Sequence, residues 1–458
     1  MLDQSFSADN FFRIFHFENR KGTFNRDLLS PGYLAVHEEV KRLFYDRHTF
    51  SSHEFKEKLN ELNDKKDDAL RKHLQLVSDS CNMKAFKFKL SKFERNGKEM
   101  FTVNHDAPSF FAMKQLQFNV HRTFKVKQTN RYDIVKNLRI LLEDGFPKIF
   151  VKIDIRAFYQ SIPQHSLLRK IDENQLLNFH SKKMIKDLIF SYEHMKNPGI
   201  QKTGQGIPRG VGLSAYLSEL YMRDLDNQMR DISDICYYNR YVDDMVFIFI
   251  PRSKEKIVDY LQEIKDIITD HGLSLKDGSD GDPDKVFTMN FFSQSHQAEF
   301  NLLGYKFCIA DRKLQELKLS DNKKAKYNNR IKATIEHYNS TSRYAEKAAR
   351  QLLIKRIKFL TGNFHLLNNK KRIKSGIYYS NILINDNRTP TREFEELDLL
   401  LNQHLNDLAP YPTLRVDIAK IKSRIRQRYS FQSGFFKRHS RFHAFSDIDL
   451  NEIIKAWK

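Results

Sequence analysis

The spacing of hydrophobic and polar positions along the chain predicts both helices and strands. In 51–79, apolar residues recur at helical spacing while opposite charges occupy the other face, which predicts a surface helix pair. In 86–103, polar and apolar residues alternate around an Asn-Gly pair, the usual signal of a β-hairpin. The segments 285–292 and 299–309 alternate in the same way and are also expected to form hairpins.

The middle of the chain, from 132 to 310, alternates between the two kinds of element. The expected order is a helix, an apolar strand, a long helix, a strand-turn-strand and another helix, at 132–145, 148–155, 214–231, around 241–244, and at 254–272. This order predicts an α+β sheet domain. After 311 the pattern is helical and basic, with interruptions at 385–390 and 410–412.

The net charge narrows the range of partners. The 458 residues carry 78 Lys and Arg against 57 Asp and Glu, a formal charge of +21. From Asp321 to Lys458 there are 28 basic and 13 acidic residues, so this part alone carries +15. Aromatic residues are interleaved with the cations, a composition that suits a nucleic-acid backbone. A solvated helix face is the plainer explanation for any single basic run, and a membrane surface is a weaker one.

Cysteine usage and hydropathy indicate the compartment. The three cysteines, Cys81, Cys236 and Cys308, are far apart and show no CxxC spacing, which excludes a disulfide framework and a structural zinc site. No stretch approaches the roughly 20 apolar residues that span a bilayer. The first residues lack the apolar core of a signal peptide. We therefore expect a cytoplasmic protein without membrane contact.

Three acidic residues occupy strand ends, where an acid is costly unless it binds a cation. Asp154 ends an apolar strand, and Asp243 and Asp244 form a pair in a tight turn before a hydrophobic strand. If these strand ends converge, their oxygens would suit hard divalent cations such as Mg²⁺. That is the layout of two-metal phosphoryl transfer. For the Asp pair taken alone, a turn with solvated acids is the alternative.

Three strings resemble, in order and spacing, the palm motifs of reverse transcriptases. They are VKIDIRAFYQSI at 151–162, GQGIPRGVGLSAYLSELYM at 204–222 and YVDD at 241–244. The resemblance implies a right-hand polymerase fold with fingers, palm and a helical thumb. It also implies that Asp154, Asp243 and Asp244 are the catalytic acids and that, with Ile155, they make the site for two Mg²⁺ ions.

The same resemblance implies roles around the nucleotide. Tyr159 would be the steric gate that excludes the ribose 2′-OH, which favours DNA synthesis over RNA synthesis. Phe158 beside it would turn into the core. Arg209 and Gly210 stand where many reverse transcriptases carry Gln and Gly, and Arg209 puts a cation beside the nucleotide or templating base. This departure leaves the usual template contact in doubt.

Basic residues are candidates for contacting the incoming triphosphate. Lys125, Lys127 and Arg131 are expected to lie in the fingers, with a solvated strand face as the alternative. Lys285 could bind the nucleotide and act as the general acid for pyrophosphate, and Lys276 competes for that role.

The primer end has its own predicted contacts. Tyr241 and Val242 would lie under it, by the same resemblance. Leu303, Gly304 and Tyr305 resemble the primer grip, a hairpin turn whose Gly lets the backbone pass close to the primer.

Other strings resemble a narrower group, the antiphage reverse transcriptases of bacteria. LDQSFSADNFFRIFHFENRKG, TNRYDIVKNLRILLEDG and RIKFLTGNFHLLNNKKRIKSGIYYSN are similar to the first of the two reverse transcriptases of type 3 defence systems. The similarity spans nearly the whole chain. It implies a dedicated non-coding RNA as template, and a second reverse transcriptase or a further copy of the chain as partner.

Together these expectations describe an RNA-directed DNA polymerase that makes DNA from dNTPs in antiphage defence. Residues 1–95 would form an N-terminal helical extension and the start of the fingers, 96–310 the fingers and palm, and 311–458 a basic helical thumb with a C-terminal extension. One alternative is a template-independent or protein-primed DNA polymerase on the same fold. Another is a catalytically silent nucleic-acid scaffold, although the three intact acids argue against it.

Overall fold

The computed structural model separates the chain into two compact units. Unit 1 comprises 1–129 and 151–288, and unit 2 comprises 130–150 and 289–458. This grouping differs from the three predicted parts, whose functional division stays a prediction. The structure describes the following residues: 2–21, 24–95, 97–196, 203–253, 256–276, 285–292, 297–365, 374–384, 392–409, 417–437 and 442–457.

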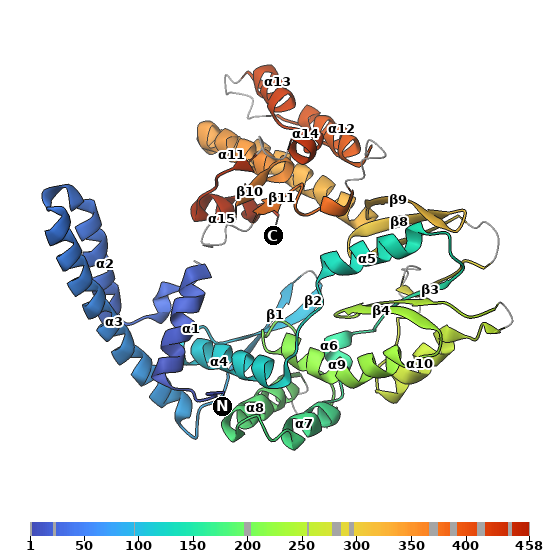
Figure 1. The fold of residues 1–458 in the computed structure, drawn as a ribbon. Helices are drawn as coiled ribbons and strands as arrows, with labels where there is room; N and C mark the ends of the chain where they lie inside the picture. The colour runs from blue at the N-terminus through green and yellow to red at the C-terminus, as the bar shows by residue number, and fades with distance from the viewer. Residues whose placement is uncertain are drawn as a thin grey trace. The chain divides into compact units, whose positions relative to one another are not determined.

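Helices form the N-terminal part of unit 1: α1 (Ala8–Lys21), α2 (Pro31–Tyr45), α3 (Ser52–Asn82) and α4 (Ala107–Phe124), with 3₁₀ turns at Arg26–Leu28 and Arg47–Thr49. The predicted helix pair at 51–79 is instead one continuous helix, α3, which begins at a capping box between Ser51 and Glu54. Its partners are α1 and α2, which pack along it (Figure 1). Leu70 and Leu74 of α3 are fully buried in this contact region.

The predicted hairpin at 86–103 is confirmed. Strands β1 (Leu90–Arg95) and β2 (Lys98–Val103) pair antiparallel, with Arg95 opposite Lys98. Gly97 in the connection has a φ of +66°, which suits glycine because it lacks a Cβ.

A four-stranded sheet with the order β4-β5-β3-β6 forms the centre of the predicted palm. Its strands are β3 (Ile149–Asp154), β4 (Ile235–Tyr241), β5 (Asp244–Phe249) and β6 (Phe287–Asn290). All six side chains of β3 are buried, so both faces of this strand are covered. The expected hairpin at 285–292 is wrong, because this segment supplies the single strand β6 to the sheet.

Five helices accompany this sheet in unit 1: α6 (Phe158–Ser161), α7 (Gln164–Glu173), α8 (Phe179–Lys196), α9 (Ser214–Arg230) and α10 (Tyr260–Asp270). The long helix predicted at 214–231 is confirmed as α9. The helix predicted at 254–272 is shorter than expected, because the side chain of Asp259 caps α10 by accepting from the N–H of Gln262. The alternation of helices and strands confirms the α+β class.

Unit 2 begins with α5 (Arg131–Glu143), which packs against the strand β9. Strands β7 (Ala298–Leu302), β8 (Tyr305–Ala310) and β9 (Lys313–Leu319) form an antiparallel sheet, so the hairpin predicted at 299–309 is confirmed. The 41-residue helix α11 (Asp321–Thr361) follows, with a non-helical residue at Ala345.

The remainder of unit 2 mixes helices with short strands. Its elements are β10 (Asn363–His365), β11 (Lys374–Gly376), the 3₁₀ turn Ile382–Ile384, α12 (Arg392–Asn406), α13 (Ile418–Arg428), α14 (Phe431–Phe436), β12 (Phe442–His443) and α15 (Asp447–Lys455). The region after 311 is mostly helical, as expected, but β9 and the sheet β11-β10-β12, which the sequence pattern did not predict, also belong to it. The predicted interruptions at 385–390 and 410–412 lie outside the described residues.

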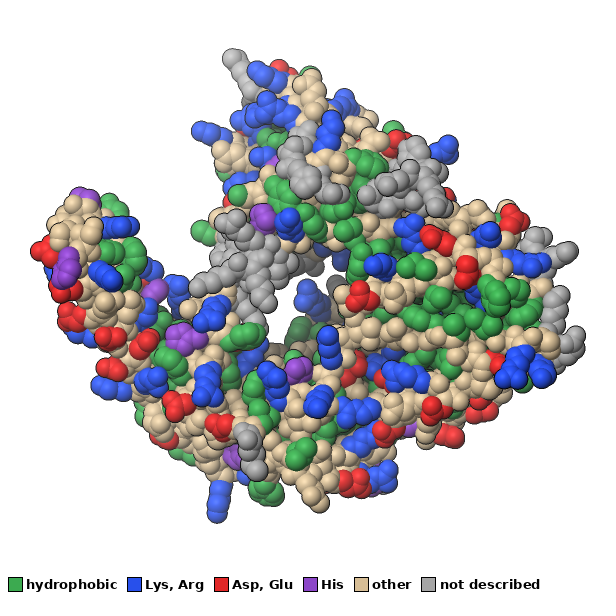
Figure 2. Space-filling model, in the orientation of Figure 1, with side chains coloured by type: hydrophobic (Ala, Val, Ile, Leu, Met, Phe, Trp, Pro, Cys, Tyr) green, Lys and Arg blue, Asp and Glu red, His purple; other side chains and the backbone are tan. Residues whose placement is uncertain are grey.

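Basic residues are concentrated on some helices of unit 2. Helix α13 has the sequence IAKIKSRIRQR, which carries cations and no acid. Figure 2 shows Lys and Arg side chains gathered over α13, whereas α2 and α3 present acidic and basic side chains together. None of the described helices is long and apolar enough to cross a membrane.

Candidate active site

The three predicted acids lie at the ends of neighbouring strands. Asp154 is the last residue of β3, and Asp244 is the first residue of β5, the next strand in the sheet. Asp243 lies in the two-residue turn between β4 and β5, which is closed by the pair Tyr241 and Asp244. The main-chain N–H of Ile155 donates to the main-chain oxygen of Asp243 at 3.2 Å. The structure therefore brings the two acidic segments side by side.

The turn that carries Asp243 has an unusual backbone at Val242. This residue has a φ of +60°, a region that β-branched residues rarely adopt. Two-residue hairpin turns normally place Gly or Asn at such a position. Strain of this kind is often found at functional sites, where the surrounding structure holds it in place.

A buried arginine supplies that support. Arg240 is only 6% exposed, and its Nη1 donates to the main-chain oxygen of Val242 at 3.1 Å. Its Nε and Nη2 each donate to Asp226 of α9 at 2.8 Å, and its Nη2 donates to Glu219 of the same helix at 2.7 Å. Burial opposes the charge, but the two acids outweigh it and raise the pKa of Arg240. The arginine thus ties the acidic turn to α9.

Sequence reasoning missed this ion-pair cluster. The available signal was an arginine inside an otherwise uncharged strand, directly before the YVDD string. Glu219 and Asp226 lie two turns apart on one face of α9 and could have been recognised as its partners.

Two lysines contact the acid of β3. Asp154 is 4% exposed, and Nζ of Lys276 lies 2.6 Å from its Oδ1. Nζ of Lys285 lies 3.4 Å from its Oδ2. Such partners offset the high cost of burying a carboxylate. Both candidates for the general acid therefore lie beside the same carboxylate, and the choice between them stays open.

Burial and neighbouring acids raise the pKa of Asp243 and of Asp244. Burial, followed by the charge of Asp154, raises the pKa of Asp243. Burial, followed by the charges of Asp154 and Asp243, raises the pKa of Asp244 to about 6, although Lys152 and Lys285 act in the opposite direction. The three carboxylates thus form a region of mutual repulsion.

Whether this region suits a divalent cation depends on the atoms that could coordinate the ion. Among the residues that the structure describes, no group of three or more His, Cys, Asp or Glu side chains is arranged as a metal site. The donor chemistry nevertheless fits Mg²⁺, because the acids offer hard oxygen ligands and repel one another in the absence of a cation. In the described arrangement, two lysines supply positive charge to one of the three acids.

The predicted nucleotide contacts surround Tyr159. Phe158 is 1% exposed, in agreement with the expectation that it turns into the core, whereas Tyr159 is half-buried. The guanidinium of Arg209 lies 5.7 Å from the centre of the Tyr159 ring. Gly210 has a φ of +98°, and a Cβ there would lie 2.7 Å from the main-chain oxygen of Phe101. The glycine therefore lets this loop pass close to β2.

The basic candidates of the fingers are divided between the units. Lys125 and Lys127 are exposed after α4 in unit 1, and neither forms an ion pair with a described residue. Arg131 is the first residue of α5 and belongs to unit 2. The contacts of these three residues with a triphosphate stay predictions.

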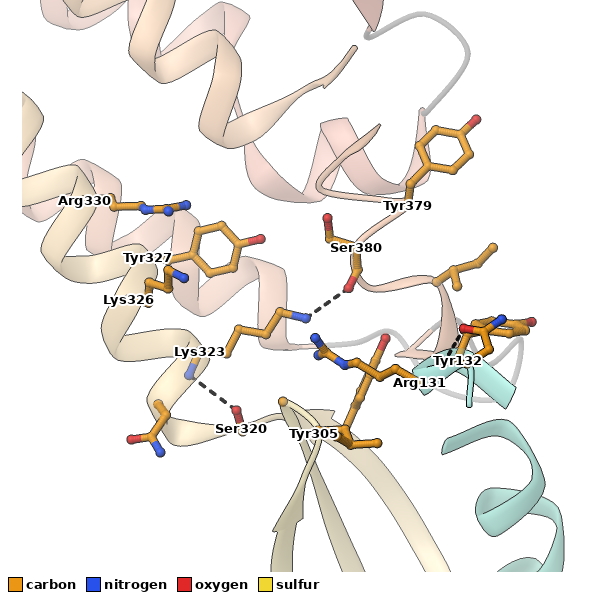
Figure 3. Close-up of a pocket in the computed structure, with 15 residues that line it drawn as sticks. Arg131, Tyr132, Tyr305, Ser320, Lys323, Lys326, Tyr327, Arg330, Tyr379 and Ser380 are labelled. Atoms are coloured by element: carbon orange, nitrogen blue, oxygen red, sulfur yellow. Dashed lines mark hydrogen bonds between the residues drawn. The ribbon is translucent and has the colours of Figure 1, made fainter. Parts of the chain in front are cut away.

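The predicted primer grip is a hairpin turn, as expected. Leu302 pairs with Tyr305, and between them Leu303 and Gly304 have φ values of +48° and +80°. Positive φ at both central residues is the signature of a type I′ turn. Arg131 lies against it (Figure 3), because a Cβ on Gly304 would come within 2.6 Å of Nη2 of that arginine.

Part of this chain matches a known protein family. A family described as "Reverse transcriptase (RNA-dependent DNA polymerase)" matches residues 100–307. No curated protein matches the chain.

Similar solved structures include three telomerases from yeasts of the genus Candida. The apo telomerase from Candida tropicalis truncated from its C-terminal domain is 15% identical over 51% of this chain and 55% of that chain, with a TM-score of 0.34. The Candida albicans enzyme in complex with a fragment of telomeric RNA is 10% identical over 83% and 62%, with a TM-score of 0.36. Apo telomerase from Candida tropicalis is 13% identical over 81% and 61%, with a TM-score of 0.35.

These matches cover only part of this chain and only part of the telomerase chains. The chain spans between 55% and 62% of the length of the three telomerase chains. The family match covers all three acids, the Arg209 loop and the turn at Leu303. Residues 100–307 of this chain therefore match a reverse transcriptase domain.

Proposed function

We propose that the chain is an RNA-directed DNA polymerase that extends a 3′-OH with dNTPs. The observation that carries this proposal is the meeting of Asp154 with the Asp243-Asp244 turn at the ends of neighbouring strands, inside the matched domain. A decayed palm would be expected to have lost at least one of these acids.

Different residues of the site would have different roles in phosphoryl transfer. The three carboxylates, with Ile155 beside them, would hold divalent metal ions, which reverse transcriptases generally use. Bound there, Mg²⁺ would neutralise charge on the substrate phosphates and lower the pKa of the attacking hydroxyl. Lys276 or Lys285 would donate the proton to the leaving pyrophosphate, since both ammonium groups are held beside Asp154.

Substrate selection would follow from Tyr159 and Arg209. A half-buried ring at Tyr159 is suited to exclude a 2′-OH, which favours deoxynucleotides. Arg209 places a cation within 5.7 Å of that ring, where it would meet the nucleotide or the templating base. Lys127 and Arg131 remain candidates for the triphosphate, and Tyr241, Val242, Leu303, Gly304 and Tyr305 remain candidates for the primer grip.

The basic residues of 311–458 would bind the nucleic acid. We propose that the template is a non-coding RNA and that this thumb and C-terminal extension hold it together with the DNA product. An excess of +15 in residues 321–458 supports the assignment. The resemblance of three long strings to antiphage reverse transcriptases supports a role in bacterial defence, with a second reverse transcriptase or a further copy of the chain as partner. A cytoplasmic location is part of the proposal, because Cys81, Cys236 and Cys308 are free thiols.

The test begins with the protein purified together with its own nucleic acid. Sequencing identifies what co-purifies, and incorporation of labelled dNTPs is measured for the wild type and for the double variant Asp243→Ala with Asp244→Ala. We expect the same RNA to co-purify with both proteins and incorporation to disappear in the double variant. Asp68→Ala, at an exposed position of α3, is the matched control and should leave both results unchanged.

Two further arms separate the alternatives. Each dNTP is supplied alone, before and after removal of bound RNA by ribonuclease. Incorporation that does not depend on any nucleic acid would reject the hypothesis of RNA-templated synthesis and favour template-independent synthesis. A wild-type protein that incorporates no dNTP with any divalent metal would instead favour the scaffold.

A further inference from the structure

The loop that carries Arg209 and Gly210 is held by a buried carboxylate that has no role in the proposed chemistry. This loop, residues 203–210, lies between α8 and α9 in the chain. Glu193 of α8 is 1% exposed, although carboxylates are rarely buried to this extent. The loop and Glu193 both belong to unit 1, so their contacts lie inside one compact unit.

Both carboxylate oxygens of Glu193 accept hydrogen bonds. Its Oε1 accepts from the main-chain N–H of Thr203 at 2.5 Å and from the hydroxyl of Thr203 at 3.0 Å. Its Oε2 accepts from Nε2 of Gln164 at 2.9 Å. Burial opposes the charge of this carboxylate, but the hydrogen bonds from Thr203, Gln164 and Gly204 outweigh burial and lower its pKa. Glu193 is therefore held as an ionised acceptor at the start of the loop.

Gln164 connects Glu193 with the middle of the loop. It is the first residue of α7 and is 5% exposed. Its Nε2, besides contacting Glu193, donates to the main-chain oxygen of Gly206 at 2.9 Å. Its main-chain N–H donates to the main-chain oxygen of Gly204, also at 2.9 Å. One buried amide group thus joins the carboxylate of α8 to the backbone of the loop.

The middle of the loop is paired with the backbone around the predicted steric gate. The main-chain N–H of Ile207 donates to the main-chain oxygen of Tyr159 at 2.8 Å, and that of Gly206 donates to Ile162 at 2.8 Å. Gly206 has a φ of +91°, and a Cβ there would lie 2.8 Å from the main-chain oxygen of Gln160. The glycine therefore allows the loop to lie directly against this segment.

The end of the loop is fixed to the hairpin β1–β2. The main-chain N–H of Phe101 in β2 donates to the main-chain oxygen of Arg209 at 2.7 Å. The guanidinium of the same arginine lies 5.7 Å from the centre of the Tyr159 ring. Because the loop is held at its start, middle and end, a change at its start is transmitted through the backbone to Arg209 and Tyr159. These are the side chains expected to meet the nucleotide.

We propose that Glu193 is a positioning residue for the selection of the incoming nucleotide. Together with Gln164 it fixes the 203–210 loop against the backbone of Tyr159. The loop in turn sets how the Arg209 guanidinium and the gate ring lie around the sugar of the nucleotide. Glu193 is buried and acts through the loop. The inference rests on the proposed function, because it concerns the incorporation of dNTPs at this site.

The test compares variants of the full-length protein with the wild type. Glu193→Gln keeps the size of the side chain, but its amide offers one acceptor oxygen in place of two and sets an N–H donor against other donors. Gln164→Met removes the amide that reaches the loop and keeps an unbranched side chain of similar size. Val77→Ala, at a buried position of α3, is the control for lost stability. Glu173→Gln, at an exposed position of α7, is the control for lost charge.

Incorporation of each dNTP and of the matching rNTP on the co-purified RNA gives kcat and KM. We expect the KM for dNTPs to rise about tenfold in Glu193→Gln and in Gln164→Met, the effect of losing one hydrogen bond to a charged group, with a smaller change in kcat. The ratio of kcat/KM for dNTPs over rNTPs should fall several-fold. Hydrogen–deuterium exchange of the nucleotide-free variants should be faster in 203–210. Both controls should keep the wild-type values, and circular dichroism shows whether each variant is folded.

The outcomes separate this inference from the proposed function. A wild-type protein that incorporates no dNTP would reject the proposed function and the inference with it. An active wild type whose folded Glu193→Gln and Gln164→Met variants keep its KM and its preference for dNTPs would overturn the inference alone. Equal changes in Val77→Ala would also overturn it, because they would follow from lost stability and not from a displaced loop.

Discussion

Asp244→Asn removes one negative charge from the crowded acids at the end of β5 while keeping the size of the side chain. Burial, followed by the charges of Asp154 and Asp243, raises the pKa of Asp244 from 3.8 to about 6. Its ionised form is therefore disfavoured in the folded protein, and this cost is greatest at neutral pH. We expect the variant to be more stable than the wild type and to lose dNTP incorporation.

The size and pH dependence of the effect follow from the shift. A raised acid pKa means that the folded state binds more protons than the unfolded state between pH 3.8 and about 6, so its contribution to stability falls as the pH rises through this window. At about pH 7.5 the full pKa shift lowers the free energy of unfolding of the wild type by about 3 kcal/mol. At about pH 4.5 it lowers it by about 1 kcal/mol. Partial solvation of the side chain makes about 3 kcal/mol an upper value.

Urea unfolding of both proteins at the two pH values measures this difference. Asp68→Asn, at an exposed position of α3, is the control and should change the free energy of unfolding by less than about 0.5 kcal/mol. Mg²⁺ should stabilise the wild type more than Asp244→Asn, because the cation relieves the same repulsion. A variant that is equally stable or less stable than the wild type at neutral pH, with a silent control, would refute the reasoning that the acids crowd one another.

Three other substitutions test the supports of the site. Arg240→Met should lower the free energy of unfolding by about 3 kcal/mol, because it removes the cation that pairs with Glu219 and Asp226 in a buried site, and unchanged urea unfolding would contradict this. Gly210→Ala should reduce both stability and dNTP incorporation, since its Cβ would lie 2.7 Å from a backbone oxygen. The control Gly32→Ala, which meets nothing within 4 Å, should be neutral or stabilising by up to about 1 kcal/mol. Tyr159→Ala should raise incorporation of ribonucleotides relative to deoxynucleotides, and an unchanged ratio of kcat/KM values would remove this residue as the gate.

The sequence by itself determined the chemistry of the candidate site and most of the elements that carry it. The spacing of hydrophobic residues was enough to predict the strand that ends in Asp154, the hairpin around Gly97 and helix α9. Each of them depends on a pattern among residues that are close together in the sequence. The acids at the strand ends could be recognised for the same reason, since a charged residue directly after an apolar segment can be read from the sequence.

Only the tertiary structure decided which groups meet. The strand β6 pairs with β3 rather than forming a hairpin of its own, because sheet order depends on pairing between segments far apart in the sequence. Asp154 meets Lys276 and Lys285 for the same reason.

The buried Arg240 cluster shows the same limit of sequence reasoning. It joins side chains from a strand and a helix, and its charge balance depends on which acids come near. Residue spacing reports neighbours along one helix or strand, whereas burial and long-range contact set the pKa of Asp244.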